Sequence, residues 1–246
     1  IEYFTREDCV LAGAEEAARV LGKTGARVVW SRRSGERIVA DEPFLRAEGP
    51  AAALHMAWKV SLNLCDHLSG VATRTRAIVD AAHSANPACE VLTTRKSMPG
   101  VKDLLTKAVT CGGAFPHRLG ASETVLVFDH HITFMGGFEA FLEALPALRG
   151  RCVEKKLFVE AGPGEARCLA KAGVDGIQLD KLPVDDLAAL VPELRAIDPH
   201  LTLIAAGGIN LQNAAAYAAT GVDGLATTAP FTAKPIDMSV RMKRVE

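Results

Sequence analysis

The feature of this sequence that most constrains its fold is a regular alternation of apolar runs and helical stretches beyond residue 86. We expect strands at 90–95, 124–128, 156–161, 176–180, 202–206 and 224–228. We expect helices at about 100–110, 137–149, 163–172, 184–196 and 211–219. Continuously apolar runs such as LFVEA are typical of strands covered on both faces. The alternation predicts parallel βα units, and the lack of a GxGxxG fingerprint after the first strand favours a barrel over an open doubly wound sheet.

The first 50 residues have a different pattern, in which short apolar runs are separated by turn residues. They predict strands near 2–4, 9–12, 27–30 and 44–47 and a helix at 14–23, hence a small α+β unit. From Pro50 the spacing becomes helical, with a break expected at Ser69-Gly70 and a second helix through Ala85. The alternating segment 235–246 is expected to return as a strand to the N-terminal sheet. The predicted domains are therefore 1–68, the α+β domain, and 69–234, the barrel.

Composition excludes some classes of function. A net charge of −1 over 246 residues gives no basic excess for binding nucleic acid. No stretch reaches the roughly eighteen apolar residues of a membrane span. The six cysteines are scattered without a CxxC pair, which predicts free thiols and a cytoplasmic location. The chain begins at Ile1, without a methionine or a signal-peptide pattern, so we expect a segment to be missing before it.

Charged residues and glycines gather where the predicted barrel strands end. In such a barrel the site lies at the carboxyl ends of the strands. The strand ends carry, in chain order, Arg95-Lys96, Asp129-His130, Glu160, Asp180-Lys181, Gly207-Gly208 and Thr227-Thr228. A further basic pair, His117-Arg118, lies in the loop before the second strand. The pattern predicts a site for an anionic ligand.

The glycine pair and the two carboxylates suggest what that ligand contains. Gly207-Gly208 joins a strand to a helix for which Asn210 is a candidate N-cap, so a phosphate could approach the backbone N–H groups there. The other reading is an ordinary tight turn. Glu160 and Asp180 form either a structural ion network or a site for Mg²⁺ through water and for sugar hydroxyls, and a neighbouring phosphate favours the second. His130-His131 lacks a third metal ligand and, on a strand, would point to opposite faces, so we do not expect a metal there.

Several motifs together resemble one family. TRKSMPGVKDLLTKAVTCGGAFPHRLGASETVLVFDHH is preceded by NLCDHLSGVATRT and followed by VEA, QLDK, AAGGIN and GVDGLATTAP. In this order they resemble the quinolinate phosphoribosyltransferases, or nicotinate-nucleotide pyrophosphorylases, along essentially the whole chain. The resemblance implies an incomplete TIM-like α/β barrel of the type II phosphoribosyltransferases with a small N-terminal α+β open sandwich. It also implies a homodimer with shared active sites, possible higher oligomers, and an N-terminal helical segment that this chain lacks.

The resemblance also implies residue roles. The cationic cluster for the carboxylates and diphosphate of the substrates would be Arg95, Lys96, His117 and Arg118. Lys59 stands where the family has an arginine that reaches across from the partner subunit. Glu160 and Asp180 match the acidic residues near the ribose and Mg²⁺. The 5′-phosphate site would be formed by Gly207, Gly208, Thr227 and Thr228.

Some positions depart from the family pattern. Phe128 replaces a lysine, whereas His130, Pro116 and Lys181 replace asparagines. Loss of the lysine removes a cation from a pocket for a dicarboxylate, and because an unpaired buried carboxylate is costly, quinolinate should bind poorly. The combination of FDHH, PHR and LDK is similar to the ModD subgroup, pyrophosphorylase-like proteins associated with molybdenum transport.

The resulting hypothesis is an enzyme that moves ribose-5-phosphate between phosphoribosyl pyrophosphate and a small anionic, heterocyclic acceptor and releases pyrophosphate. Lys96, Glu160 and Asp180 would be catalytic and Mg²⁺ the cofactor. One alternative is a nicotinate-nucleotide pyrophosphorylase that acts on quinolinate. Another is a non-catalytic anion or nucleotide sensor linked to molybdate uptake.

Overall fold

The computed structural model describes residues 1–120 and 123–245, which form two compact units. The sandwich unit comprises Ile1–Val79, Lys96–Phe115 and Thr228–Glu246. The barrel unit comprises Asp80–Arg95 and Pro116–Thr227. The predicted boundary between residues 68 and 69 stays a prediction.

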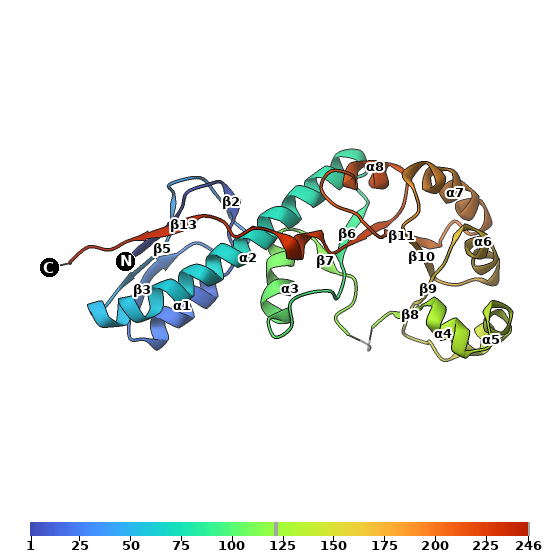
Figure 1. Ribbon diagram of the computed structural model, residues 1–246, viewed down its shortest axis with the longest axis horizontal. Coiled ribbons are helices and arrows are strands. Elements are labelled where there is room, and N and C mark those ends of the chain that lie inside the picture. Colours follow the sequence, from blue (N-terminus) through green and yellow to red (C-terminus); the bar gives the residue numbers. More distant parts are fainter. Residues whose placement is uncertain (121–122, 246) are drawn as a thin grey trace. The chain divides into compact units, whose positions relative to one another are not determined.

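The sandwich unit is built on a four-stranded antiparallel sheet with the order β13-β1-β5-β3 (Figure 1). Its strands are β1 (Glu2–Thr5), β3 (Arg27–Ser31), β5 (Pro43–Glu48) and β13 (Met238–Arg241). β13 pairs with β1, as expected for the C-terminal segment. Helix α1 (Ala14–Lys23) packs against β3 and β5, and β2 (Cys9–Val10) pairs with β4 (Arg37–Ile38). The α+β architecture predicted for this part of the chain is confirmed.

Helix α2 (Ala51–Ala85) is one continuous helix, so the break predicted at Ser69-Gly70 is wrong. A Cβ on Gly70 would overlap the carbonyl oxygen of Lys234. The Ser69 hydroxyl accepts a hydrogen bond from the N–H of Ala12 (2.9 Å) and donates one to its carbonyl (3.2 Å). Both residues are therefore selected by close packing against other segments of the sandwich unit, and neither ends the helix.

Helix α3 (Lys102–Cys111) also belongs to the sandwich unit. The ammonium of Lys107 lies 2.7 Å from carboxylate oxygens of both Glu15 and Glu16 in α1. The Lys107 side chain is only 31% exposed, so these ion pairs are partly shielded from water. They fix α3 to α1.

The barrel unit contains a seven-stranded sheet with the order β7-β6-β12-β11-β10-β9-β8. Its strands are β6 (Glu90–Thr93), β7 (Phe115–Pro116), β8 (Val125–Val127), β9 (Leu157–Glu160), β10 (Gly176–Asp180), β11 (Thr202–Ala206) and β12 (Gly224–Thr227). In the sheet order from β6 to β8, each strand pairs in parallel with its neighbour: β6 with β12, β12 with β11, β11 with β10, β10 with β9 and β9 with β8. The helices are α4 (Asp129–Phe134), α5 (Phe138–Gly150), α6 (Pro163–Ala172), α7 (Val184–Ile197) and α8 (Ala214–Ala219).

The parallel strands curl into a half-barrel with helices α5 to α8 outside them (Figure 1). An apolar cluster of Leu126, Phe158, Ile204, Ala206 and Ala226 packs between the strands. Because the sheet order ends at β7 on one side and β8 on the other, the described strands do not close a barrel. The predicted incomplete α/β barrel with a small N-terminal sheet domain is confirmed.

Two loops of the barrel unit differ from the sequence prediction. Strand β8 ends at Val127 and Asp129 begins α4, so Asp129, His130 and His131 are helical. Helix α8 begins at Ala214 after Asn213, so Asn210 is not its N-cap. In the sandwich unit, the element η1 (Ala229–Thr232), a 3₁₀ turn, was not predicted either.

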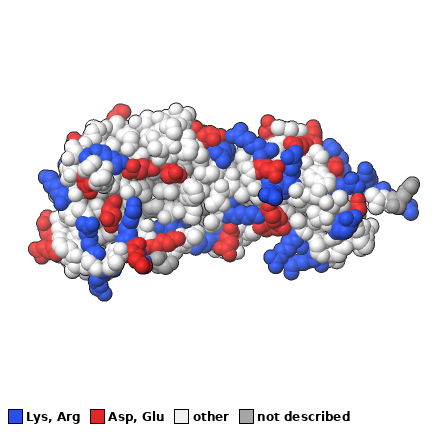
Figure 2. Space-filling model, turned by 180° about the vertical axis from the view of Figure 1, so that it is seen from behind, with Lys and Arg blue, Asp and Glu red and all other residues white. Residues whose placement is uncertain are grey.

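Charged side chains of both signs are interspersed on the face shown in Figure 2, with no continuous field of one sign. This agrees with the net charge of −1. Among the described residues, no helix has the length and apolar character needed to cross a membrane.

Candidate functional site

Three basic side chains meet beside the end of β6. Arg95 follows β6, and the backbone N–H of His117 donates to the carbonyl of Thr93 at 2.9 Å, which holds the loop after β7 against that strand. Burial lowers the pKa of His117, and the positive charges of Arg118 and Arg95 lower it further. Burial and Arg95 also lower the pKa of Arg118. The predicted cations of the barrel unit therefore lie within electrostatic range of one another, as a site for an anion requires.

An aromatic cluster follows β8. Phe128 is partly buried and packs on the apolar cluster inside the half-barrel. The imidazole of His130 stacks on its ring with the centroids 5.5 Å apart and the planes 8° apart. The backbone N–H of Phe128 donates to Nδ1 of His131 at 2.9 Å, and the guanidinium of Arg118 lies 5.9 Å from the Phe128 ring centroid. The sequence prediction named Phe128 and His130 but missed this role of His131, because it placed the segment on a strand.

The acidic residues lie on neighbouring strands. Glu160 ends β9 and Asp180 ends β10, and the register pairs Glu160 with Gln178. The buried Gln178 amide donates to Oε2 of Glu160 at 2.6 Å. Burial raises the pKa of Glu160; the Gln178 hydrogen bond opposes the shift, and the charge of Asp180 adds to it. Sequence reasoning missed Gln178, whose signal is an amide within the otherwise apolar run GIQLD.

The glycine loop after β11 packs directly on the end of β10. Gly207 has φ 87° and Gly208 has φ 73°. A Cβ on Gly207 would lie 2.5 Å from Cγ of Lys181 and 2.8 Å from Oδ1 of Asp180. A Cβ on Gly208 would meet nothing within 4 Å. Gly207 is thus required by close packing as well as by its backbone angle, whereas Gly208 is required by its backbone angle alone.

Polar side chains fix the shape of this loop. The amides of Asn210 and Asn213 both donate to the carbonyl of Gly208, at 3.0 and 3.1 Å. The buried Thr227 hydroxyl donates to the carbonyl of Ile209 at 2.6 Å. The Thr227 hydroxyl therefore holds the loop through its backbone, and we expect Thr227 to position the loop for a phosphate.

Lys181 has a backbone conformation that few side chains adopt. Its φ is 54°, in the left-handed region that is unfavourable for residues other than glycine. Its N–H donates to the carbonyl of Ala206 at 2.7 Å, and its ammonium lies 3.8 Å from Oδ2 of Asp180. The side chain is 80% exposed, so this ion pair contributes little to stability. The strained lysine therefore keeps its ammonium beside the acidic pair.

The barrel unit holds most of the predicted site residues. They are Arg95, His117, Arg118, Phe128, His130, Glu160, Asp180, Lys181, Gly207, Gly208 and Thr227. The sandwich unit holds the other three, which are Lys59, Lys96 and Thr228. The participation of all these residues in the site, in either unit, stays a prediction.

The residues present limit how a metal could be bound. No group of three His, Cys, Asp or Glu side chains that could hold a metal ion occurs among the described residues. Glu160 and Asp180 supply hard oxygen donors from adjacent strands. Two carboxylates suit Mg²⁺, which usually keeps several waters and takes further oxygens from substrate phosphates.

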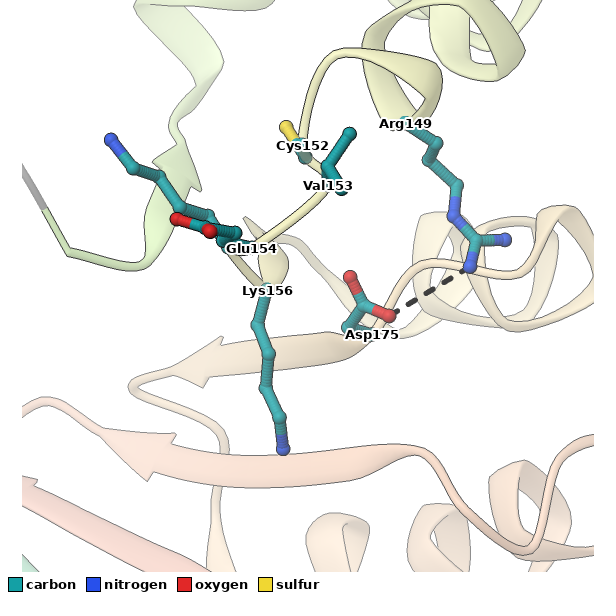
Figure 3. Close-up of a pocket in the computed structure, with 7 residues that line it drawn as sticks. Arg149, Cys152, Val153, Glu154, Lys156 and Asp175 are labelled. Atoms are coloured by element: carbon teal, nitrogen blue, oxygen red, sulfur yellow. Dashed lines mark ion pairs between the residues drawn. The ribbon is translucent and has the colours of Figure 1, made fainter.

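A separate hollow of about 330 Å³ lies at the opposite end of the strands, before Leu157 (Figure 3). Arg149 points toward Asp175, 3.8 Å away, whereas Lys156 points away from that carboxylate. Asp175 also accepts the N–H of Leu157 at 2.7 Å, which fixes the start of β9. In α/β barrels this face contributes to stability and the other face to catalysis, so the hollow is not the candidate site.

The half-barrel and its N-terminal sheet domain define the class: a phosphoribosyltransferase-type incomplete α/β barrel. Two family models match, "Quinolinate phosphoribosyl transferase, C-terminal domain" at residues 71–241 and "Quinolinate phosphoribosyl transferase, N-terminal domain" at residues 1–69. The chain belongs to the quinolinate phosphoribosyl transferase family. It is accordingly an enzyme of the pentosyltransferase type, similar to nicotinate-nucleotide pyrophosphorylases.

Individual relatives agree with this assignment. The chain is 43% identical to the pyrophosphorylase ModD of Rhodobacter capsulatus over 83% of its own length and 79% of that protein. It is 36% identical to the carboxylating nicotinate-nucleotide pyrophosphorylase of Mycobacterium leprae over 91% of its own length and 79% of that protein. The solved nicotinate-nucleotide pyrophosphorylase of Francisella tularensis superposes with a TM-score of 0.87 at 27% identity, covering 97% of this chain and 84% of that one.

Proposed function

We propose that this enzyme transfers ribose-5-phosphate between phosphoribosyl pyrophosphate and a small anionic heterocyclic acceptor. The observation that carries the proposal is the convergence of three groups at the carboxyl ends of the barrel strands. Arg95 and Arg118 supply positive charge and Glu160 and Asp180 supply carboxylates. The loop at Gly207, which packs on the end of β10, would supply backbone N–H groups. The arginines would bind the diphosphate, the carboxylates would stabilise the ribosyl cation, and the loop would bind the 5′-phosphate.

The reaction needs no nucleophile from the protein. The bond between C1 of the ribose and the pyrophosphate oxygen breaks, and its electron pair leaves with the pyrophosphate. A lone pair of the acceptor then forms the new bond to C1. Arg118 and Lys96 would stabilise the charge that develops on the leaving group. Glu160, held by Gln178, and Asp180 would stabilise the positive charge at C1 and bind the ribose hydroxyls.

Glu160 and Asp180 would also hold Mg²⁺ through water, in keeping with their hard oxygen donors. When bound, Mg²⁺ neutralises charge on the pyrophosphate. The protein's own contribution is to keep the Glu160 carboxylate oriented, which the 2.6 Å hydrogen bond from Gln178 achieves.

The acceptor is proposed to differ from quinolinate, and the biological setting to be molybdenum transport. The setting follows from the resemblance to the ModD subgroup, and the 43% identity to a pyrophosphorylase ModD supports membership of that subgroup. The second candidate function is that of a carboxylating nicotinate-nucleotide pyrophosphorylase, which the 36% identity to the Mycobacterium leprae protein favours. Phe128 is an uncharged ring at a position where the family pattern has a lysine, so we expect a dicarboxylate acceptor to bind poorly. A third candidate is a non-catalytic sensor. The acidic pair and the glycine loop favour an enzyme over a sensor, because phosphoribosyl transfer needs carboxylates at the ribosyl centre and a site for the 5′-phosphate.

We further propose that the enzyme acts in the cytoplasm as a homodimer in which Lys59 reaches the partner's site. Lys59 lies on α2, between the exposed side chains of Met56 (71%) and Val60 (55%). Methionine is among the residues that are enriched at protein–protein interfaces. Mixing Lys59→Ala subunits with Glu160→Gln subunits tests the shared site. Because one of the two hybrid sites regains both residues, the mixture should recover activity that neither variant has alone; no recovery would remove Lys59 from the partner's site.

The proposed activity is tested by pyrophosphate release from phosphoribosyl pyrophosphate in the presence of Mg²⁺ and a panel of heterocyclic acids. We expect release that depends on an acceptor and is lost in Glu160→Gln. Tight binding of phosphoribosyl pyrophosphate without release for any acceptor would favour the sensor. Release with quinolinate as the best acceptor would favour the second candidate.

A further inference from the structure

The residues after β8 form an aromatic wall, defined here as Phe128, His130 and His131. The rings of Phe128 and His130 are stacked, with centroids 5.5 Å apart, and the ring of His131 lies 4.2 Å from that of His130. One side of Phe128 is fixed by the apolar cluster inside the half-barrel. His131 is fixed by the hydrogen bond that its Nδ1 accepts from the N–H of Phe128. The wall is thus a preformed aromatic cluster at the carboxyl end of β8, in which the rings of Phe128 and His130 are parallel and the ring of His131 is tilted by 46° and 51° to them.

Two of the three side chains of the wall, Phe128 and His131, contribute no positive charge to the binding of an anionic acceptor. Nδ1 of His131 accepts a hydrogen bond and so carries no proton, which makes this imidazole neutral. Burial, His130 and Arg118 all lower the pKa of His131, in agreement with the neutral form. Phe128 carries no charge. The guanidinium that lies over the wall is that of Arg118, 5.9 Å from the Phe128 ring centroid.

A ligand on this surface would meet two kinds of contact. A planar ring can stack on the aromatic wall, where offset rings attract each other beyond their apolar burial. One anionic group on that ring can receive charge-assisted hydrogen bonds from Arg118. A second carboxylate that lies against the uncharged ring of Phe128 would lose hydration there without a hydrogen-bond donor from that side chain, which is unfavourable.

We propose that the acceptor is a planar heteroaromatic ring that carries a single negative charge and stacks on the aromatic wall, with Arg118 as its anion contact. This inference rests on the proposed transfer reaction and specifies the class of its acceptor. It makes Phe128 the residue that sets the preference for a monoanion over a dianion.

Binding and turnover are measured separately with three probes: nicotinate, picolinate and the dicarboxylate quinolinate. Calorimetry gives the dissociation constants, and pyrophosphate release gives kcat/KM. The wild-type enzyme should prefer at least one monocarboxylate over quinolinate by about tenfold or more. Phe128→Leu removes the ring but keeps an apolar side chain, and should weaken binding of the monocarboxylate about two- to tenfold. Phe128→Tyr, which keeps the ring, should bind it like the wild type.

Phe128→Lys should shift the preference toward quinolinate by about tenfold or more, because the new ammonium pairs with the second carboxylate. Phe134→Lys is the matched control: it adds the same charge to α4 at a side chain that is 91% exposed, and should leave the preference unchanged. A wild-type preference for quinolinate, or equal monocarboxylate binding by Phe128→Leu and Phe128→Tyr, would overturn the inference. If the monocarboxylate binds as expected but no acceptor supports pyrophosphate release, the transfer reaction fails and the ligand class stands.

Discussion

Substituting the two loop glycines one at a time probes the packing of the candidate phosphate loop. In Gly207→Ala the new methyl group would lie 2.8 Å from Oδ1 of Asp180 and 2.5 Å from Cγ of Lys181. Alanine at positive φ costs about 1–2 kcal/mol and overpacking about 1–3 kcal/mol, so we expect a loss of about 2–5 kcal/mol. Gly208→Ala has the same kind of backbone cost without a clash, so we expect a loss of about 1–2 kcal/mol.

Activity should separate the two variants further than stability does. The clash in Gly207→Ala displaces the Asp180 carboxylate, and a displacement of about 1 Å can cost about 100-fold in rate. Urea unfolding gives the free energies, and pyrophosphate release gives kcat/KM. Equal losses of stability and activity in the two variants would refute the packing of Gly207 on Asp180.

Three further predictions concern other positions. Lys181→Asn should raise the free energy of unfolding by about 1 kcal/mol, because asparagine tolerates the left-handed conformation (φ 54°) better than lysine does. The same substitution should raise the KM for phosphoribosyl pyrophosphate. Asp41→Asn, at φ 64° in the sandwich unit, is the control that should leave activity unchanged, and a destabilised Lys181→Asn would contradict the strain. Glu160→Gln should gain stability relative to the wild type as pH rises. Burial raises the pKa of Glu160, so the folded wild type binds this proton more tightly than the unfolded chain and loses stability as pH rises through that range. Urea unfolding at pH 4 and pH 8 measures the free energy of unfolding of Glu160→Gln relative to the wild type. A stability gain of the variant that is larger at pH 4 than at pH 8 would refute the raised pKa. Gly70→Ala should destabilise by about 1–3 kcal/mol through overpacking, whereas Gly22→Ala, with open space at its Cβ in α1, should stabilise by about 0.5–1 kcal/mol; equal thermal shifts would contradict the close packing of α2.

Periodicity predicted the elements whose burial follows one simple pattern. The strand predicted at 176–180 and the helices at 14–23 and 163–172 have the observed bounds, because the strand is buried along its length and each helix buries apolar residues at helical spacing. The break at Ser69-Gly70 was wrong because glycine is also used where a backbone approaches closely, and that contact with Lys234 comes from a segment more than 160 residues away. Such long-range packing has no local signal in the sequence.

The candidate site was predictable where it depends on strand ends. Parallel strands bring their carboxyl ends together, so Glu160 and Asp180 are neighbours as expected. Gln178 was missed because a polar residue in an apolar run has no meaning until the register places it opposite Glu160. The His130-His131 pair was misplaced because an apolar strand that ends at Val127 does not reveal how soon the next helix begins.

The central claim is that this chain transfers a phosphoribosyl group, and detection of the product tests it most directly. Wild-type enzyme is incubated with phosphoribosyl pyrophosphate, Mg²⁺ and a pyridine monocarboxylate, and the acceptor is followed by mass spectrometry. We predict an acceptor whose mass has increased by one phosphoribosyl group, formed in amounts equal to the pyrophosphate released and absent with Glu160→Gln. Pyrophosphate released without any ribosylated acceptor, or the same product yield from Glu160→Gln, would contradict the claim.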